Sequence, residues 1–147
     1  MKWTIKAFDD LTPTELYAIL QLRSEVFVVE QNCVFQDMDN KDQQSFHLMG
    51  WQDNKLVAST RLLPKGLGFD EISIGRVVTS KLVRRTGVGK LLMQESIAQL
   101  DKLFGKQPIR IGAQCYLLEF YKSFGFVPEG EIYLEDDIEH IEMIFNR

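Results

Sequence analysis

A short run of basic residues and glycines carries the clearest chemical signal in this chain of 147 residues. The run Arg84-Arg85-Thr86-Gly87-Val88-Gly89-Lys90 follows an apolar stretch at 72–78 and leads into a periodic segment at 91–104. A strand that ends in a glycine-bearing turn and continues into a helix leaves backbone N–H groups unpaired at the positive end of the helix dipole. Glycine has no Cβ, so a ligand can approach the backbone closely. The run therefore predicts a phosphate-binding loop.

Two common phosphate-binding motifs do not fit this spacing. A P-loop requires a glycine five residues before Gly89 and a serine or threonine after Lys90, where this chain has an arginine and a leucine. A dinucleotide-binding fingerprint would begin at Gly87 and require a small residue at the position of Leu92. The loop is therefore expected to bind another kind of phosphate ligand.

The composition is that of an ordinary globular protein and excludes several classes. Hydrophobic residues make up 45% of the chain and charged residues 26%, and the formal net charge is −4. An acidic chain with a single basic run lacks the extended basic surface of a nucleic-acid-binding protein, so we expect no nucleic-acid partner. No apolar stretch approaches the length of a membrane span and no secretory signal precedes Asp9, so we expect no membrane partner and a cytoplasmic location. The length predicts one domain, residues 1–147.

The two cysteines do not indicate a metal site. Cys33 and Cys115 lie far apart, and neither has the paired spacing that structural zinc requires. We therefore expect no bound metal.

The N-terminal half is predicted to form a strand, a helix and the start of a β-meander. Alternating apolar residues at 3–7 predict the strand. Thr12-Pro13-Thr14-Glu15 combines an N-cap, a proline at the first helical position and a capping-box glutamate, so a helix should begin at Thr12 and end near Val29. Residues 33–45 are expected to form a loop. Three β segments follow, at 46–52, 56–63 and 71–79, the first two joined by an Asp53-Asn54 turn.

The C-terminal half is predicted to contain a crossover unit and a hairpin. Met93, Ile97, Leu100 and Phe104 step along one helical face, which should be buried, and Gly105 should end that helix. A strand at 109–113 should run parallel to the strand that contains Ile74. A short helix at 117–124 and two antiparallel β segments, at 131–135 and 139–145, complete the chain. The fold class is thus α/β, with a mixed, mostly antiparallel sheet and one central parallel strand pair.

Two motifs in order resemble the signatures of the GNAT superfamily of N-acetyltransferases. Arg84, Gly87 and Gly89 match the pattern Arg/Gln-x-x-Gly-x-Gly/Ala of its acetyl-CoA pyrophosphate loop, and the segment 120–126, Phe-Tyr-Lys-Ser-Phe-Gly-Phe, resembles the signature that follows its fifth strand. The resemblance extends over nearly the whole chain to the ElaA-like branch, through segments such as Leu-Arg-Ser-Glu-Val-Phe-Val-Val-Glu-Gln at 22–31. It implies a splayed central parallel strand pair with helices on both faces of the sheet.

The resemblance also implies how acetyl-CoA, the co-substrate, is bound. The thioester arm would lie in the gap between the splayed strands and bond main-chain groups of Val77, Val78 and Thr79. The pyrophosphate would accept backbone N–H bonds from the loop between Arg85 and Lys90, with Arg84 bracing that loop. Gln114 stands where the superfamily commonly has asparagine, so its amide is expected to contact the cofactor with a different reach.

Direct acetyl transfer needs a neutral amine near the thioester carbon, stabilisation of the developing oxyanion and a proton for the departing thiolate. Tyr121 is the candidate general acid, and a backbone N–H near Val78 is the candidate oxyanion donor. The base is left open between a water chain and side chains that could rim the acceptor side: Glu30, Asp37, Asp39, His47, Glu71 and His140. Glu30 and His47 are the leading candidates for the base or for the acceptor site. Cys115 offers a different route, through an acetyl-cysteine intermediate.

The resemblance implies an acetyl-CoA-dependent N-acetyltransferase that acts on a primary amine, carried by a small molecule or a peptide, in a ternary complex. If carboxylates line the acceptor side, the acceptor should be cationic, such as a polyamine, an aminosugar or a lysine side chain. Two alternatives stay open: a non-catalytic acyl-CoA-binding or sensing domain, and a nucleotide-binding regulator. A homodimer is also left open, because the sheet-edge segments could pair between subunits.

Overall fold

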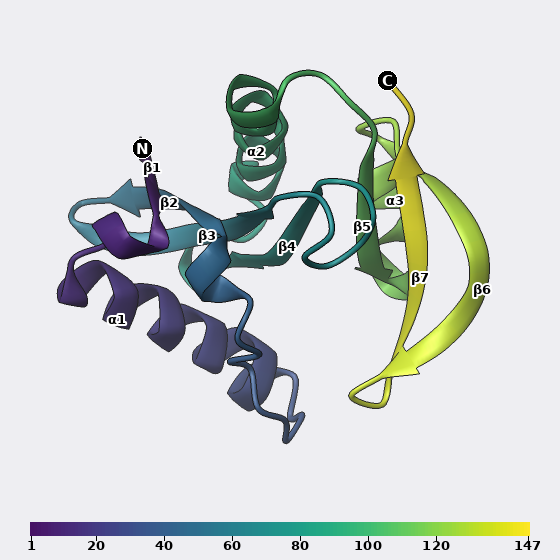
Figure 1. The fold of residues 1–147 in the computed structure, drawn as a ribbon. Helices are drawn as coiled ribbons and strands as arrows, with labels where there is room; N and C mark the ends of the chain where they lie inside the picture. Colours follow the sequence, from purple (N-terminus) through teal and green to yellow (C-terminus); the bar gives the residue numbers. More distant parts are fainter.

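The computed structural model describes all 147 residues and places four antiparallel strands in an N-terminal sheet, in the order β1-β2-β3-β4 (Figure 1). These strands are β1 (Lys2–Ala7), β2 (Phe46–Gln52), β3 (Lys55–Leu63) and β4 (Ser73–Thr79). The β2–β3 hairpin turns at Asp53 and Asn54, whose φ angles of 50° and 62° are both left-handed. Such a pair is typical of a type I′ turn, so the tight hairpin predicted at these residues is confirmed.

A second antiparallel sheet has the order β5-β7-β6. Its strands are β5 (Ile109–Gln114), β6 (Val127–Glu135) and β7 (Ile138–Phe145). Strand β6 begins at Val127, earlier than the predicted start at Glu131, because a register shift between Glu129 and Tyr133 and a left-handed Gly130 at φ 88° interrupt its alternation. The pattern of alternating residues is visible in the sequence only after that irregularity.

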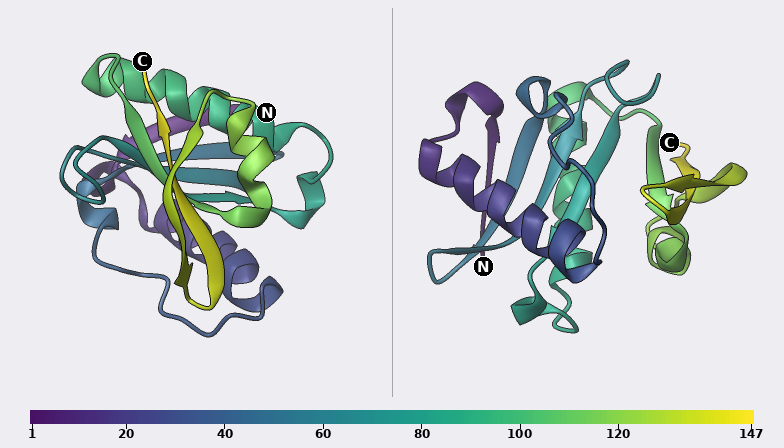
Figure 2. Two further views of the ribbon diagram at one scale, coloured as in Figure 1. Left: turned by 90° about the vertical axis from the view of Figure 1, so that its right-hand side faces the viewer. Right: turned by 90° about the horizontal axis from the view of Figure 1, so that it is seen from below.

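The two sheets meet at β4 and β5, which lie parallel but touch only where they begin (Figure 2). One parallel bridge joins Ile72 to Ile109, and the Arg110 backbone N–H donates to the Ile72 carbonyl oxygen at 3.1 Å. Past this point the two strands have no further backbone pairing and diverge. The predicted splayed parallel pair is therefore confirmed, although its contact lies before Ile74 rather than at it.

The predicted helices are present, and the first has the predicted start. In α1 (Pro13–Arg23), the Thr12 hydroxyl accepts from the Glu15 N–H at 3.1 Å, and the Glu15 carboxylate accepts from the Thr12 N–H at 2.8 Å. The chain then continues without a break as a π-helical segment, η2 (Ser24–Glu30), so the helical stretch ends near Val29 as predicted, although its last part is π-helical rather than α-helical. The other helices are α2 (Val88–Phe104) and α3 (Leu118–Lys122), with short 3₁₀ turns η1 (Phe8–Asp10), η3 (Asp42–Gln44), η4 (Lys81–Val83) and η5 (Cys115–Leu117).

Helices α1 and α2 cover opposite faces of the first sheet, and α3 packs on the second (Figures 1 and 2). The predicted apolar face of α2 is buried: Met93 and Leu100 are fully enclosed, and they join residues of β3, β5 and α3 in one hydrophobic cluster. Because this cluster bridges the two sheets, it holds β4 and β5 in place on either side of their splay. None of the helices combines the length and the apolar character that a membrane crossing requires.

Candidate functional site

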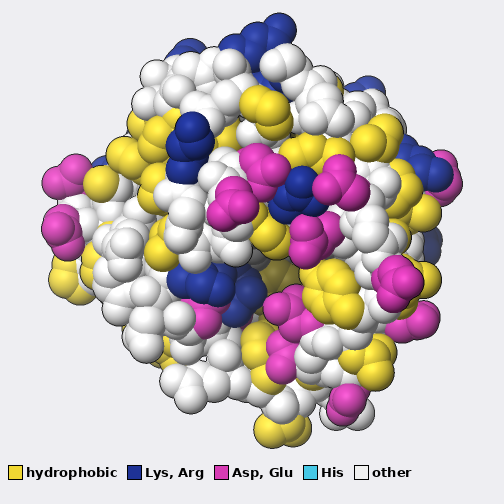
Figure 3. All heavy atoms as spheres, turned by 45° about the vertical axis from the view of Figure 1, so that its right-hand side comes forward, with side chains coloured by type: hydrophobic (Ala, Val, Ile, Leu, Met, Phe, Trp, Pro, Cys, Tyr) yellow, Lys and Arg dark blue, Asp and Glu magenta, His cyan; other side chains and the backbone are white.

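The divergence of β4 from β5 opens a cavity of about 1000 Å³. One end lies at the loop that precedes α2, and the other lies between the loop 33–41 and the face of the second sheet. Figure 3 shows the molecule hollowed near the centre of this face, with cationic and acidic side chains both at the rim. Residues expected in the site that line this cavity are Glu30, Asp39, Val77, Val78, Thr79, Arg84, Gly89, Gln114, Tyr121 and His140.

Strand β4 presents a free backbone edge to the cavity. It pairs with β5 only through the bridge at Ile72, so the edge of β4 at 77–79 has no strand partner on that side. A bulge lies in the same stretch, where Arg76 and Val77 oppose the single residue Thr60 of β3 and Arg76 takes a left-handed φ of 48°. An extended ligand arm could add to this edge as a strand would.

The loop after β4 has the geometry expected of a phosphate-binding loop. Gly87 adopts a left-handed φ of 87° immediately before α2 begins at Val88. The first helical hydrogen bond is donated by the Leu91 N–H to the Gly87 carbonyl oxygen at 3.2 Å. The N–H groups of Val88, Gly89 and Lys90 therefore precede the helical ladder and are free to bind an anion.

Side chains of the same loop contribute unequally. Arg85, with a left-handed φ of 63°, and Lys90 are exposed, whereas Val88 is buried, so Val88 can bind a ligand only through its backbone. The Thr86 hydroxyl donates to the Val83 carbonyl oxygen within the loop, which makes its role structural. Arg85, Thr86, Gly87, Val88 and Lys90 do not line the cavity itself but continue from its end along the start of α2.

Arg84 links the phosphate loop to the end of η2. Its guanidinium donates two hydrogen bonds to the Glu30 carboxylate, one of them at 2.8 Å, and a third to the Thr79 carbonyl oxygen at 3.2 Å. The hydrogen bonding to Arg84 holds the pKa of Glu30 below its usual range and raises the pKa of Arg84. A carboxylate held in this way is a poor proton acceptor, so the contacts of Glu30 favour a bracing role over the role of base.

Tyr121 projects from α3 into the cavity, and its residue is only 6% exposed. Its ring packs edge-on against Phe120 and Phe126, and its hydroxyl makes no hydrogen bond within the chain. Burial raises the pKa of Tyr121 well above the ordinary tyrosine value. The phenol therefore keeps its proton throughout the neutral range, as a general acid must.

Gln114 ends β5 and also faces the cavity. Its carbonyl oxygen Oε1 accepts a hydrogen bond from the Gln31 amide at 3.2 Å. This contact fixes the orientation of the Gln114 amide and leaves its NH₂ group as the end that can reach a ligand.

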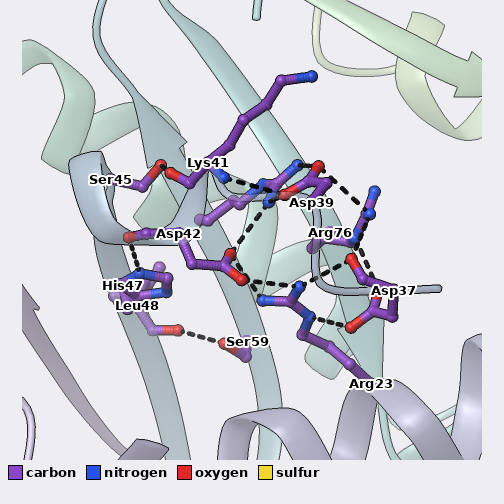
Figure 4. A network of polar contacts seen from close by, with 11 residues as sticks. Arg23, Asp37, Asp39, Lys41, Asp42, Ser45, His47, Leu48, Ser59 and Arg76 are labelled. Atoms are coloured by element: carbon purple, nitrogen blue, oxygen red, sulfur yellow. Dashed lines mark hydrogen bonds and ion pairs between the residues drawn. The ribbon is translucent and has the colours of Figure 1, made fainter. Parts of the chain in front are cut away.

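A buried ion network forms the wall opposite the second sheet (Figure 4). Arg23, which is 1% exposed, bonds Asp37 at 2.7 Å and Asp42 at 2.9 Å. Arg61 bonds Asp39 at 2.6 Å and Asp42 at 3.0 Å, and Arg76 reaches both Asp37 and Asp39. Three arginines thus face three aspartates, while the Lys41 side chain points away from these ion pairs.

Burial acts to raise the pKa of Asp39, but the hydrogen bonds and charge of Arg61 outweigh it and hold that pKa well below its usual range.

The structure does not bring His47 into the candidate site. The residue is 1% exposed on β2, does not line the cavity, and bonds the Asp42 carbonyl oxygen through Nε2 at 2.9 Å. Burial lowers the pKa of His47, against the opposing effect of that hydrogen bond. Its position removes it as a base or acceptor-site residue. Glu71 and Cys115 also lie off the cavity lining, and Glu71 is held by Arg110 at 2.9 Å.

Sequence reasoning missed Arg23, Arg61 and Arg76 as a connected group. A signal was present for Arg23, since this arginine falls on the apolar side of α1, where a charge must be buried with partners. It also missed Tyr133, which lines the cavity and stacks on His140 with 5.7 Å between ring centroids. Nothing in the local sequence marks Tyr133, because its role depends on the register of β6 with β7.

Comparison with known proteins agrees with this geometry. Residues 9–146 match the model of the acetyltransferase (GNAT) domain. The protein ElaA of Escherichia coli is 41% identical over 97% of this chain and 95% of its own length, and a Synechocystis protein named UPF0039 protein sll0451 is 40% identical over 99% and 95%.

Solved structures give the same result for the fold. An acyl-CoA N-acyltransferase from Pseudomonas aeruginosa superposes with a TM-score of 0.92 at 44% identity, covering 98% of this chain and 99% of that one. The crystal structure of E. coli ElaA gives a TM-score of 0.91 at 42% identity, with the same coverage. A GNAT acetyltransferase from Elizabethkingia anophelis with acetyl-CoA bound shares the fold, with a TM-score of 0.66 at 17% identity over 99% of this chain and 98% of that one.

Proposed function

The chain belongs to the GNAT acetyltransferase family, and from this premise we propose that it transfers the acetyl group of acetyl-CoA to a primary amine by direct attack in a ternary complex. Membership makes it an acyl-CoA-dependent acyltransferase. The finer assignment rests on one observation: a single cavity reaches the glycine loop that precedes α2 at one end and carries the phenol of Tyr121 along its length.

The residues present fit acetyl-CoA as the acyl donor. The free N–H groups at the start of α2 and the exposed cations Arg85 and Lys90 beside them suit a pyrophosphate, while Arg84 braces the loop through Glu30 and Thr79. The unpaired edge of β4 at Val77, Val78 and Thr79 suits the amides of the pantetheine arm, which would lie between β4 and β5 like an added strand. Gln114 borders the same gap from β5 and offers its NH₂ group.

The proposed chemistry uses two groups of this chain at the thioester. A backbone N–H beside the bulge, near Val78, stabilises the oxyanion that develops as the amine attacks the carbonyl carbon. The Tyr121 hydroxyl donates its proton to the thiolate as the C–S bond breaks. Because a buried phenol is a weak acid, this transfer depends on close contact with the sulfur rather than on acidity.

The acceptor end of the cavity favours a cationic amine. Glu135 and Asp136 of the second sheet line this end without an arginine partner, whereas Glu142 beside them is paired with Arg110 at 3.1 Å. On the opposite wall the arginines are neutralised by aspartates, which leaves Lys41 as the cation there. The local field therefore attracts positive charge on the side from which the amine must arrive. A polyamine, an aminosugar or a lysine side chain satisfies this requirement.

Two measurements test the proposal. Thermal-shift titration with acetyl-CoA, CoA, ATP and NAD should show stabilisation by the two CoA species alone, as expected when a ligand binds only the folded state. Thiol release from acetyl-CoA should then depend on an added amine from the cationic classes. Binding of acetyl-CoA without amine-dependent thiol release would instead support a non-catalytic acyl-CoA sensor, and stabilisation by ATP or NAD would support a nucleotide-binding regulator.

A further inference from the structure

The central strand of the second sheet presents a histidine to the cavity. His140 of β7 is 7% exposed, lines the cavity, and lies between Gln114 of β5 and Tyr133 of β6 in the strand register. Tyr133 covers one face of the imidazole, at an interplanar angle of 28°. A small residue is required beneath that tyrosine, because a Cβ on Gly112 would come within 2.8 Å of its hydroxyl. The ring of His140 is therefore held in one orientation at the acceptor end.

The contacts of the ring determine which nitrogen can accept a proton. Nδ1 lies 2.7 Å from the Ile138 carbonyl oxygen, and since a carbonyl can only accept, Nδ1 carries the hydrogen. In the neutral ring the lone pair is then on Nε2. A carboxylate oxygen of Glu135 lies 3.3 Å from Nε2, where it stabilises the imidazolium that forms when Nε2 takes up a proton.

The other candidate bases are engaged elsewhere. Glu30 and Asp39 each pair with an arginine that lowers the pKa of the carboxylate. Glu71 pairs with Arg110 and does not line the cavity, and neither does His47. His140 is thus the one histidine on the cavity in a chain that has only two, and imidazole is the side chain best suited to exchange protons near neutral pH.

We propose that His140 is the catalytic base of the acetyl transfer, with Glu135 as the positioning residue that stabilises its protonated form. This inference rests on the proposed function. The neutral amine attacks the thioester carbon, so the N–C bond forms while the C–S bond breaks. Nε2 of His140 takes the proton that the amine nitrogen loses, and the thiolate takes the proton of Tyr121. His140 then releases its proton to solvent and Tyr121 regains one, so the net products are the acetylated amine and CoA thiol.

Several charged and titratable groups lie on the elements packed against the ring. On β6 and β7 and on the turn η5, which also packs on β7, they are Tyr133, Glu135, Glu142, Cys115 and Tyr116. Asp136 lines the same end of the cavity from the β6–β7 turn. Across the cavity Lys41 also lines the wall, and Arg61 and Arg76 there are paired with Asp37, Asp39 and Asp42. Of these groups, Glu135 is the one in contact with Nε2. It is therefore the group placed to orient the ring and to stabilise its protonated form during the transfer.

The test measures thiol release from acetyl-CoA with spermidine, glucosamine and a lysine-containing peptide, using whichever amine the parent protein turns over fastest. His140→Gln should lose about 100-fold or more in kcat, the range for removal of a general base, and keep its affinity for acetyl-CoA. Added imidazole should restore part of the rate to His140→Ala. Glu135→Gln should lower kcat and leave the affinity for acetyl-CoA unchanged, since the amide no longer stabilises the imidazolium that forms during the transfer.

Because the Glu135 side chain is 58% exposed, Glu135→Gln keeps the inference testable even if both His140 variants fail to fold. Turnover by His140→Gln within about threefold of the parent and with the same pH profile would overturn the inference, since base removal costs far more. An unchanged kcat in Glu135→Gln would overturn the role of that residue. Failure of the parent protein to release thiol with any amine would overturn the proposed function, and this inference with it.

Discussion

The Arg84 guanidinium and the Glu30 carboxylate form a two-pronged ion pair at the phosphate-loop end of the cavity, and Arg84 also bonds the carbonyl oxygen of Thr79. The pair joins three elements: η2, the end of β4 and the loop that leads to α2. It therefore braces the loop, as expected from the sequence for Arg84. It also places a negative charge close to the site proposed for a pyrophosphate.

Glu30→Gln separates these two effects, because the amide keeps one hydrogen bond to Arg84 and removes the charge. We expect acetyl-CoA to bind about threefold to tenfold more tightly at low ionic strength, with the gain shrinking as salt screens it. Titration calorimetry at two salt concentrations measures this. The kcat should fall by less than about tenfold, since an arginine-bound carboxylate is a poor base. A loss of about 100-fold in kcat would instead make Glu30 the base.

Tyr121→Phe tests the general acid. Phenylalanine retains the packing against Phe120 and Phe126 and removes only the hydroxyl. We expect kcat to fall by about 100-fold or more with acetyl-CoA affinity nearly unchanged. Because burial raises the pKa of Tyr121, the parent protein should show no loss of rate from this group up to pH about 10. Unchanged turnover in the variant would remove Tyr121 from the mechanism.

Local signals account for what the sequence predicted well. The capping box at Thr12 and Glu15, the Asp53-Asn54 turn and the glycine loop each depend on residues within one turn of one another. Their geometry follows from backbone and side-chain preferences that act at short range. The order of elements could therefore be predicted from local signals, whereas the splay that forms the cavity was predicted only through the resemblance to the GNAT superfamily.

The ion-pair partners of charged side chains could not be predicted from such local signals. Asp37 and Asp39 had the sequence of a solvated loop, yet they are paired with Arg23 and Arg61, which lie on other elements. His47 and His140 are both histidines on β-strands. Only the strand register places His47 in the interior and His140 on the cavity. Ion pairing and register are set by tertiary contacts, so residue type and local spacing do not determine them.

The two glycines of the phosphate loop should differ in their response to alanine. Gly87 needs its left-handed φ of 87°, so Gly87→Ala should destabilise the fold by about 1 kcal/mol and weaken acetyl-CoA binding. Gly89 lies inside α2, and a Cβ there would sit 3.8 Å from the Phe120 ring, in ordinary contact. Gly89→Ala should therefore be neutral or more stable by up to about 1 kcal/mol, and should still bind. Urea unfolding compares the stabilities of the two variants, and calorimetry compares their affinities for acetyl-CoA. Equal losses of stability would contradict the different roles given to the two glycines.

The buried arginine of α1 should be far more sensitive than a surface cation. Arg23→Met leaves Asp37 and Asp42 without their main partner in the interior, which we expect to destabilise the fold by about 3–5 kcal/mol. The matched control is Lys122→Met, which breaks an exposed pair with Glu119 and should cost less than about 1 kcal/mol. Urea unfolding measures both. Similar losses in the two variants would show that the network does not depend on Arg23.

The same network should make stability depend on acidity in a defined direction. Arg61 holds the pKa of Asp39 below its ordinary value, against the effect of burial, so folding favours the charged carboxylate. The resulting stabilisation is present in full above the unfolded-state pKa of about 3.9 and is lost as the pH falls below it. Asp39→Asn cannot titrate, so its free energy of unfolding should be lower than that of the parent at neutral pH and should decline less steeply in acid. Urea unfolding followed by Trp3 and Trp51 fluorescence, from pH about 7 down to about 3, measures both curves. Parallel curves would mean that the Asp39–Arg61 pair contributes no pH-dependent stability, and that the acid sensitivity of the fold arises from other carboxylates.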